Sequence, residues 1–385
     1  MSSETVPLTD PKQSETPPGE SEGPPQGIAL CLSGGGYRAM VFHIGVLWRL
    51  NEAGYLAKLD RVSSVSGGSI TAAALAIRWH ELGFGGDGVA SRFEELVVAP
   101  LRAMAGETID AGAVILGALL PGSHIADRVA KAYRDHLFGH RTLQDLPDHP
   151  RFVLNATNVQ SGALCRFSKP YIWDYRVGKI KNPTLELASA VGASSAFPPV
   201  LSPVVLHFKD SDFEPGTGED LQRPPFTTEM TLSDGGVYDN MGIETAWKRC
   251  ETILVSDAGG KLGAEEHPKG DWAQHSVRVL GVIDNQVRSL RKRQVIDAFR
   301  AGVRKGAYWG TRTDIADYKL ADALPCPVAR TLKLAETPTR LAEMPAELQE
   351  RLINWGYAVC DAGLRAHVDS AVAKPKGFPY SGGVG

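Results

Sequence analysis

The sequence predicts an α/β protein with a mainly parallel central sheet between helical layers. Short apolar segments that suit strands alternate with segments whose apolar residues recur at helical spacing. The first such strand, residues 28–32 (IALCL), is continuously apolar, as expected for a strand that is buried on both faces. Apolar residues make up 43% of the 385 residues, which is enough for a large core.

Two strand–turn–helix units open the ordered part of the chain. The strand at 28–32 leads through three glycines into a helix whose apolar residues, from Met40 to Leu50, recur at helical spacing and which ends at Gly54. A weaker strand at 59–65 leads into a helix over 67–83. The second unit therefore repeats the plan of the first.

The rest of the chain continues the alternation. Segment 85–150 is predicted to be mostly helical, and the polar, glycine- and proline-bearing stretch 209–226 to be an inserted loop. The other predicted elements are a strand over 151–159, a helix over 184–197, strands that end in TLSDGG (231–236) and ETILVSDAGG (251–260), a basic amphipathic helix over 284–308 and a last helix over about 344–371.

Composition excludes several classes of protein. The formal net charge is −3, so no basic surplus indicates a nucleic-acid partner. The five cysteines are scattered and form no C-x-x-C pair, which predicts neither a disulfide framework nor a zinc site and fits a reducing compartment. No cluster of potential metal ligands is evident, and we expect no cofactor. We expect a cytoplasmic protein.

Two segments bear on targeting and on membranes. Residues 1–26 have no basic start and no apolar stretch, and their Pro, Glu and Ser content predicts disorder rather than a signal peptide. The longest apolar run, within residues 111–122, is shorter than the roughly 20 residues that a membrane span needs. It is interpreted as a core helix or as a segment that contacts lipid at the interface.

The stretch SSVSGGS, residues 63–69, lies between the second strand and its helix. A sharp turn at this place can lift one side chain above the edge of a sheet when its neighbours are small, and Ser64 and Gly68 flank Ser66 in that way. Ser66 is therefore a candidate nucleophile. The alternative is a serine that only caps the helix.

A second glycine-rich site, SGGGYR at 33–38, opens the first helix. Gly34, Gly35 and Gly36 leave backbone N–H groups unblocked at a helix N-terminus, where they can bind an anion such as the oxyanion of acyl transfer. A dinucleotide-binding turn is the alternative, but Ala39 replaces the last glycine of G-x-G-x-x-G, and the Gly-Lys-Ser/Thr of a phosphate-binding loop is absent.

A carboxylate that could act as a base follows each of two later strands. Asp234 precedes Gly235 and Gly236, and Asp257 has much the same setting in VSDAGG. A histidine partner is harder to find. His207, His267 and His275 remain open as alternatives, and His43 is interpreted as a packing histidine of the first helix. The residue pattern alone does not decide among these groups.

Taken together, the three sites resemble the motifs of the patatin-like phospholipase family in order and spacing. The segments FHIGVLWRL, NATNVQSG and ASSAFPPV are also similar to its connecting segments, and the resemblance covers roughly residues 27–260. Ser64 departs from the family, which has glycine at this position. The matching motifs are Gly34-Gly35-Gly36-Tyr37-Arg38, Ser64-Val65-Ser66-Gly67-Gly68 and Asp234-Gly235-Gly236.

The resemblance implies a three-layer α/β/α sandwich and a Ser-Asp dyad without histidine. Ser66 would be the nucleophile and Asp234 the base, which selects Asp234 over Asp257. Arg38 is expected to bind the phosphate of a lipid substrate or to steady the glycine loop, and a surface salt bridge is the alternative. The implied oxyanion hole consists of Gly34, Gly35, Gly36 and Gly67, and the supporting motif residues are Ser64, Gly68, Gly235 and Gly236.

We therefore expect a lipid acyl hydrolase that cleaves phospholipids or related esters, with peripheral contact to the membrane. Two alternatives stay open: a soluble carboxylesterase or thioesterase, and a catalytically inactive lipid-binding protein on the same fold. The expected organisation is a disordered segment (1–26), a catalytic domain (27–320), a C-terminal helical extension packed on it (321–373) and a flexible tail (374–385).

Overall fold

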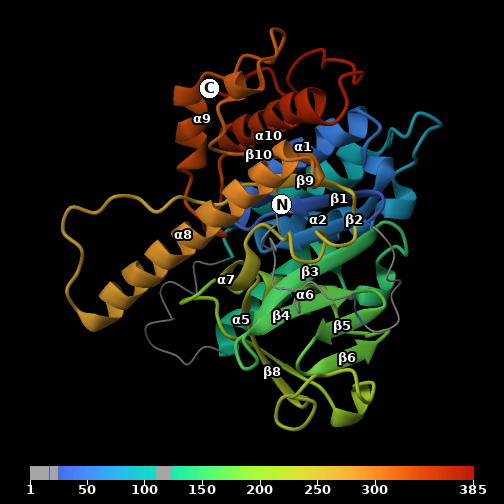
Figure 1. Ribbon diagram of the computed structural model, residues 1–385, viewed down its shortest axis with the longest axis vertical. Coiled ribbons are helices and arrows are strands. Elements are labelled where there is room, and N and C mark those ends of the chain that lie inside the picture. The colour runs from blue at the N-terminus through green and yellow to red at the C-terminus, as the bar shows by residue number, and fades with distance from the viewer. Residues whose placement is uncertain (1–16, 18–24, 110–122) are drawn as a thin grey trace, which may run out of the picture.

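The computed structural model describes residue 17 and residues 25–109 and 123–385. Ten strands in these ranges form one central sheet (Figure 1). Eight follow the order β10-β9-β1-β2-β3-β4-β5-β6, while β8 pairs with β3 and β7 pairs with β8. The strands are β1 (Ile28–Leu32), β2 (Leu59–Val65), β3 (Arg151–Asn158), β4 (Ala163–Ser168), β5 (Tyr171–Asp174), β6 (Gly178–Lys181), β7 (Val204–His207), β8 (Glu229–Asp234), β9 (Thr252–Asp257) and β10 (Lys305–Gly310).

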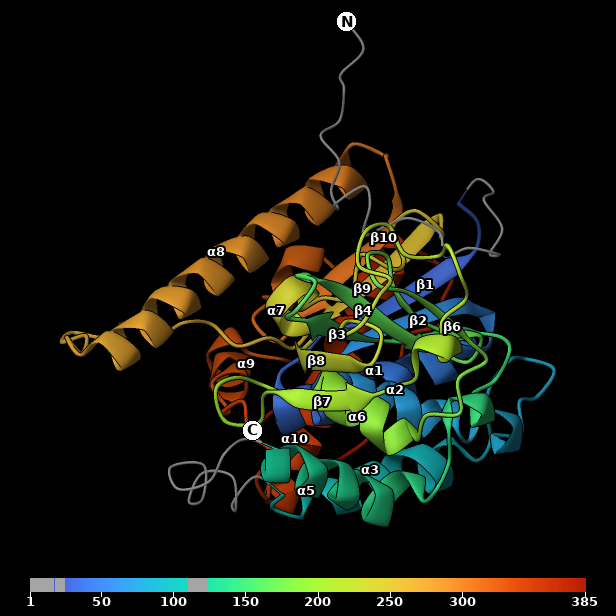
Figure 2. The same ribbon diagram turned by 90° about the horizontal axis from the view of Figure 1, so that it is seen from below.

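Helices cover both faces of this sheet, which confirms the predicted three-layer α/β fold. Figure 2 shows α7 and α8 on one side of the sheet and α1, α2, α3, α5, α6 and α10 on the other. The helices are α1 (Gly36–Glu52), α2 (Gly67–Ala76), α3 (Ala99–Ala105), α5 (Ser123–Tyr133), α6 (Leu187–Ser194), α7 (Gly236–Asp239), α8 (Trp272–Arg300), α9 (Val328–Ala335) and α10 (Ala346–His367).

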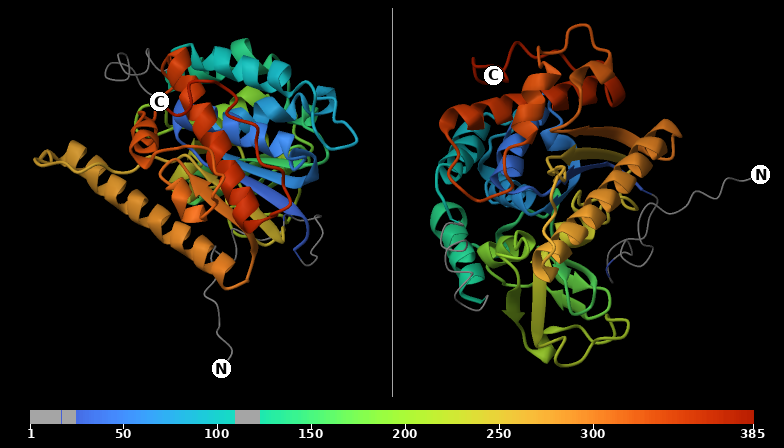
Figure 3. Two further views of the ribbon diagram at one scale, coloured as in Figure 1. Left: turned by 90° about the horizontal axis from the view of Figure 1, so that it is seen from above. Right: turned by 90° about the vertical axis from the view of Figure 1, so that its left-hand side faces the viewer.

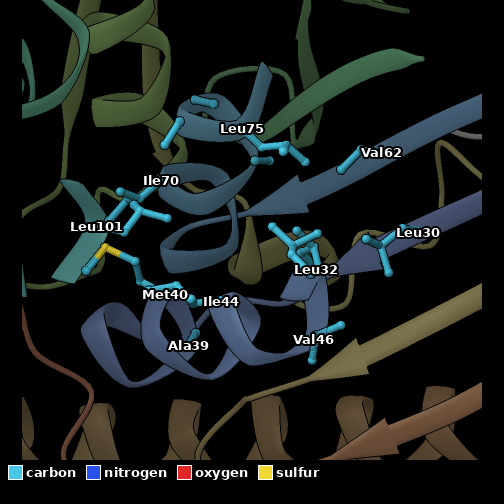
Figure 4. Packing of buried hydrophobic residues seen from close by; sticks show 14 of the residues in the cluster. Leu30, Leu32, Ala39, Met40, Ile44, Val46, Val62, Ile70, Leu75 and Leu101 are labelled. Carbon is cyan, nitrogen blue, oxygen red and sulfur yellow. The ribbon is translucent and has the colours of Figure 1, made fainter. Parts of the chain in front are cut away.

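Alternation along β1 shows why the strand is apolar throughout. Leu30 and Leu32 belong to the core on the α1 side, whereas Ala29 and Cys31 belong to a second core with residues of 241–250 and α8. On the first side, Met40 and Ile44 of α1 lie close to Ile70 of α2 (Figure 4). This packing fixes the start of both helices against the ends of their strands.

The sheet is parallel on one side and antiparallel on the other. β10, β9, β1, β2 and β3 are parallel neighbours, and β4, β5 and β6 continue from β3 in antiparallel order. Strands β4 to β6 were not predicted because they are short and carry charged residues. Arg166 is nevertheless buried, with its guanidinium 4.5 Å from the centre of the Trp173 ring.

The predicted basic helix over 284–308 is wrong at both ends. Helix α8 begins at Trp272, where the carboxylate of Asp271 accepts the N–H of Gln274 at 2.9 Å, and it ends at Arg300. Gly302 then adopts φ 70°, and Lys305–Gly310 forms β10 beside β9. The helical spacing of residues continues in the sequence past Arg300, so this pattern did not indicate that a strand follows the helix.

The C-terminal part of the chain lies against the first helix. Helix α10 packs along α1, and a buried ion pair joins Arg49 of α1 to Asp361 of α10 at 2.8 Å. The segment expected to be a flexible tail also contacts this region, because the Asn354 side chain donates to the carbonyl oxygens of Tyr380 and Gly383, both at 2.7 Å.

Two expectations concern residues outside the described ranges. The apolar run of 111–122 and nearly all of segment 1–26 lie there, so the predictions of a lipid-contact or core helix and of disorder stay predictions. Among the helices of the described residues, none combines the length and the apolar character that crossing a bilayer requires.

Candidate active site

The strand arrangement brings Ser66 and Asp234 together. β2 runs parallel to β3 and ends with Val65 beside Asn155, whereas β8 runs antiparallel to β3 and ends with Asp234 beside Ala156. Since Asn155 and Ala156 are consecutive, β2 and β8 point at each other along the same edge of β3. The residue after β2 and the last residue of β8 therefore meet end to end.

Ser66 occupies a strained turn between β2 and α2. Its backbone has φ 54° and ψ −123°, a region that non-glycine residues rarely adopt. Such strain costs on the order of 1–3 kcal/mol and persists where the surrounding structure imposes it. The Ser66 N–H donates to the Ser194 hydroxyl at 3.1 Å, and the side chain is 5% exposed. The conformation is that expected for a nucleophile turn.

A chain of buried hydroxyl groups supports this turn. The Ser69 hydroxyl lies 3.0 Å from that of Ser64 and 2.9 Å from that of Ser194. Ser194 in turn donates to the carbonyl oxygen of Asn155 at 2.7 Å. Ser64, which replaces the glycine of the resembling motif, thus has hydrogen-bond partners. Ser194 was not among the predicted site residues, although it lies in the segment ASSAFPPV that resembles the family.

Asp234 has the electrostatic setting of a base. Burial raises its pKa to about 6, and the Ser66 side chain and the Gly236 N–H act in the opposite direction. The Gly236 N–H donates to Oδ1 at 2.7 Å, while Oδ2 has no well-formed hydrogen bond within the described chain. Catalytic hydrogen bonds are often long before substrate binds. The free Oδ2 therefore leaves an acceptor position for a hydroxyl proton.

Asp257, the other candidate carboxylate, is engaged elsewhere. Tyr308 donates its hydroxyl to Oδ2 at 2.7 Å, and the Gly259 N–H donates to Oδ1 at 2.9 Å. Burial would raise the pKa of Asp257, but Arg288 and these two hydrogen bonds hold it below its usual value. Asp257 is thus a paired, ionised group and a poor base.

The glycine loop after β1 lies directly against Ser66. A Cβ added to Gly34 would lie 2.9 Å from the Ser66 Cβ, and one added to Gly67 would lie 2.1 Å from the Gly36 carbonyl oxygen. The Gly34 N–H donates to the carbonyl oxygen of Asn240 at 3.1 Å, so it is already used. In the described ranges, the N–H groups of Gly35, Gly36 and Gly67 have no acceptor.

The other glycines of the motifs allow close backbone contacts. A Cβ on Gly68 would lie 2.5 Å from the Leu32 carbonyl oxygen, and one on Gly235 would lie 2.3 Å from that of Asn155. A Cβ on Gly236 would lie 2.9 Å from Oδ1 of Asp234. Gly68 and Gly235 therefore seat the two turns on their neighbouring strands.

Arg38 holds the glycine loop from behind. Its side chain is 2% exposed, and it donates from Nε to the Ala258 carbonyl oxygen at 3.0 Å and from Nη1 to that of Thr337. Burial, reinforced by Arg288, lowers the pKa of Arg38 to about 10. These contacts favour the loop-steadying alternative of the sequence analysis, and direct contact with substrate stays a prediction.

Asn240 is a site residue that was not predicted from the sequence. A Cβ on either Gly34 or Gly236 would lie 2.6 Å from its Oδ1, so the side chain lies between the glycine loop and the Asp234 turn. Its backbone carbonyl also accepts the Gly34 N–H. The only signal was its position six residues after Asp234 in DGGVYDN.

Histidine does not take part in the described site. His43 is fully buried in α1, with Nδ1 2.9 Å from the Ser256 hydroxyl and Nε2 3.0 Å from the Ser33 carbonyl oxygen, and burial lowers its pKa to about 4. His207, His267 and His275 are exposed. In the described ranges, no histidine hydrogen-bonds to Ser66 or Asp234, and no group of residues has the make-up of a metal site.

A cavity of about 570 Å³ lies behind the glycine loop rather than over the two candidate catalytic groups. It is lined by Arg38, Arg312, residues 260–264 and residues 335–339. Neither Ser66 nor Asp234 belongs to its lining.

Comparisons with known proteins concern the family and the fold of the chain. The family model described as patatin-like phospholipase matches residues 30–247. A search of curated proteins finds no match. The fold is similar to that of human GIVD cytosolic phospholipase A2, with a TM-score of 0.50 at 12% sequence identity over 89% of this chain. The chain spans 59% of that human chain.

Two further structures are similar to this chain. The same human enzyme in complex with methyl γ-linolenyl fluorophosphonate has a TM-score of 0.50 at 14% identity, over 89% of this chain and 58% of that chain. VipD from Legionella pneumophila has a TM-score of 0.35 at 15% identity, over 90% of this chain and 67% of that chain.

Proposed function

Because this chain belongs to the patatin-like phospholipase family, we propose that it is a lipid acyl hydrolase that works through Ser66 and Asp234. The observation that carries the proposal is the end-to-end meeting of β2 and β8 along β3. The strained backbone of Ser66 and the raised pKa of the buried Asp234 carboxylate at this meeting point support the proposal.

In the first step, the Ser66 hydroxyl oxygen attacks the carbonyl carbon of a fatty-acyl ester. Asp234 accepts the hydroxyl proton, and it then gives this proton to the leaving alcohol when the ester bond breaks. The fatty-acyl group remains on Ser66 as an ester. A free aspartate has a pKa near 3.9, so a value of about 6 makes Asp234 both a better base and a usable acid near neutral pH.

In the second step, Asp234 takes a proton from water, and the resulting nucleophile attacks the acyl-enzyme. The fatty acid leaves and Ser66 regains its proton from Asp234. Both steps pass through a tetrahedral oxyanion. The N–H groups of Gly35, Gly36 and Gly67 are the donors we assign to it, and one such donor typically lowers the barrier by roughly 3 kcal/mol.

The test is a lipid-panel assay with identification of the products by mass spectrometry. We expect the wild-type protein to release fatty acids from phospholipids and Ser66→Ala to release none while it keeps its circular dichroism spectrum. Turnover of short p-nitrophenyl esters alone would favour the carboxylesterase or thioesterase alternative. A wild-type protein that turns over neither substrate class would support the inactive lipid-binding alternative. Wild-type rates in Ser66→Ala would overturn the assignment of the nucleophile.

A further inference from the structure

Helix α8 carries a stripe of exposed apolar side chains along its outer side. At 100° per residue its members fall within about 100° of the helix circumference. Their exposed fractions range from 42% to 84%. We call these residues the α8 stripe: Trp272, Val279, Leu280, Ile283, Val287 and Leu290.

The polar side of α8, in contrast, faces the protein. Arg288 donates to the Gly260 carbonyl oxygen at 2.6 Å, and Arg291 pairs with the buried carboxylate of Glu244 at 2.9 Å. In the described chain, Val295 is the one residue of this helix that is buried, and it lies near the C-terminal end. An ordinary surface helix turns its apolar side inward. The reversed arrangement marks the α8 stripe as an interaction surface.

The helix also extends well beyond the body of the molecule. Figure 3 shows its N-terminal half projecting from the sheet, with the C-terminal half packed on it. From Trp272 to Leu290 the stripe is roughly 27 Å long at 1.5 Å per residue. Val277 and Val282, outside the stripe, are exposed by 53% and 50%. This wide apolar surface exceeds the narrow seam that one partner helix would cover.

The projecting helix is joined to the candidate active site. A Cβ added to Gly259 would lie 2.0 Å from Nη2 of Arg288 and 2.9 Å from Nδ2 of Asn240. Gly259 therefore lies between Arg288 of α8 and Asn240 of the candidate active site. Asp284, one turn before Arg288, is also close enough to contribute to the electrostatics of Asp234. Helix α8 is therefore anchored, through Arg288, next to the candidate active site.

We propose that the α8 stripe docks the protein on the surface of a lipid bilayer, with the helix axis lying in the interface. The proposal rests on the proposed function, in which the substrate resides in such a surface. Two of the basic residues of α8, Arg293 and Arg300, are exposed and can meet anionic headgroups, whereas Arg288 and Arg291 pair with the protein. Trp272, 84% exposed at the start of the helix, suits the headgroup region.

The bilayer contact is tested with the full-length protein and sucrose-loaded vesicles. The variant Leu280→Gln/Ile283→Gln keeps helix-forming residues but removes the centre of the stripe. The matched control is Val328→Gln, since Val328 is 40% exposed on α9, away from the stripe. We expect the double variant to lower the partition coefficient at least about tenfold, as loss of buried apolar area requires, and the control to change it less than about twofold.

Two lipid compositions separate the contributions to binding. Phosphatidylcholine vesicles report the apolar contact, and vesicles that also contain phosphatidylglycerol should bind more tightly because α8 is basic. On binding, the tryptophan emission of the wild-type protein should shift to the blue, and Trp272→Phe should lose most of that shift. Failure of the wild-type protein to sediment with either vesicle, or equal binding by the double variant, would overturn the proposal.

A second copy of the chain is the competing occupant. Light scattering that shows a dimer in the wild-type protein and a monomer in the double variant, with unchanged vesicle binding, would assign the α8 stripe to dimerisation and overturn the bilayer contact. Hydrolysis of a soluble short-chain ester by the same preparations separates the two proposals. Unchanged ester turnover without vesicle binding refutes only the docking surface, whereas vesicle binding without any turnover refutes only the hydrolase.

Discussion

The substitution Asp234→Asn should abolish turnover and at the same time stabilise the fold at neutral pH. The structure holds a carboxylate that is 2% exposed, and burial raises its pKa from 3.8 to about 6. At 1.36 kcal/mol for each pKa unit, ionising Asp234 in the folded protein costs about 3 kcal/mol more than in the unfolded chain. Asparagine has the shape of the protonated acid and avoids this cost.

The sign of the effect follows from the raised pKa. Well below pH 3.8, Asp234 is protonated in both the folded and the unfolded protein, so its full contribution to the free energy of unfolding is present there. That stability is lost as the pH rises through about 6, because the unfolded chain ionises first and binds fewer protons than the folded protein. The Gly236 N–H bond to Oδ1 can persist in the amide. The advantage of Asp234→Asn should therefore grow from near zero at pH 4 to about 3 kcal/mol at pH 8.

Urea unfolding of both proteins at pH 4, 6 and 8 measures this difference, since titration of all other groups cancels between them. The matched control is Asp257→Asn, which should destabilise the protein at pH 8 because Arg288 and Tyr308 favour the charged form of Asp257. A constant difference in unfolding free energy between Asp234→Asn and the wild-type protein at all three pH values would show that the pKa of Asp234 is not raised, as would a less stable variant at pH 8.

Three further predictions test the surroundings of the dyad. Gly34→Ala should lower kcat/KM by about 100-fold, because its Cβ would lie 2.9 Å from the Ser66 Cβ and displace the nucleophile, whereas Gly263→Ala meets nothing within 4 Å and should be neutral. Ser194→Ala should cost about 1–3 kcal/mol in urea unfolding and lower kcat, because the Ser66 N–H loses its acceptor; unchanged stability would count against the hydroxyl chain. The kcat/KM of the wild-type protein should rise with pH to a plateau with an apparent pKa of about 6, because Asp234 must be deprotonated to act as base; a profile flat from pH 5 to 8 would contradict this role.

Much of the parallel half of the fold could be predicted from the sequence. The strand at 28–32 is an apolar run with clear boundaries, and the structure has β1 there; β3 likewise lies within the predicted strand 151–159. Strands β4 to β6 of the antiparallel half could not be predicted, because these short strands hold charged side chains that are buried through tertiary contacts. Arg166 on Trp173 is such a contact, and no local pattern indicates it.

The candidate site also combines features that the sequence indicates with features that only the fold shows. Ser66 and Asp234 follow strands in motifs of small residues, so the sequence indicated both, but only the pairing of β2 and β8 with β3 brings them together. Asp234 and Asp257 look alike in the sequence and differ in the structure through Arg288, Tyr308 and burial. Asn240 and Ser194 contact residues that are far away in the sequence, so the spacing of residues along the chain does not predict these contacts.

The sequence also did not predict that the apolar side of α8 faces away from the protein. Its arginines predicted a basic face, yet Arg288 and Arg291 turn toward the protein and pair with groups of β9 and of the segment after α7. Helical periodicity identifies which residues share a side of the helix. Which side faces the protein depends on the partners that the fold supplies.

The most direct test of the Ser66–Asp234 pair is covalent labelling with an alkyl fluorophosphonate, followed by peptide mass spectrometry. We expect a single adduct, on Ser66, that forms at least about 100-fold more slowly in Asp234→Asn, because the hydroxyl loses its base. An adduct on a different serine, or equal labelling rates in the wild-type protein and Asp234→Asn, would contradict this prediction.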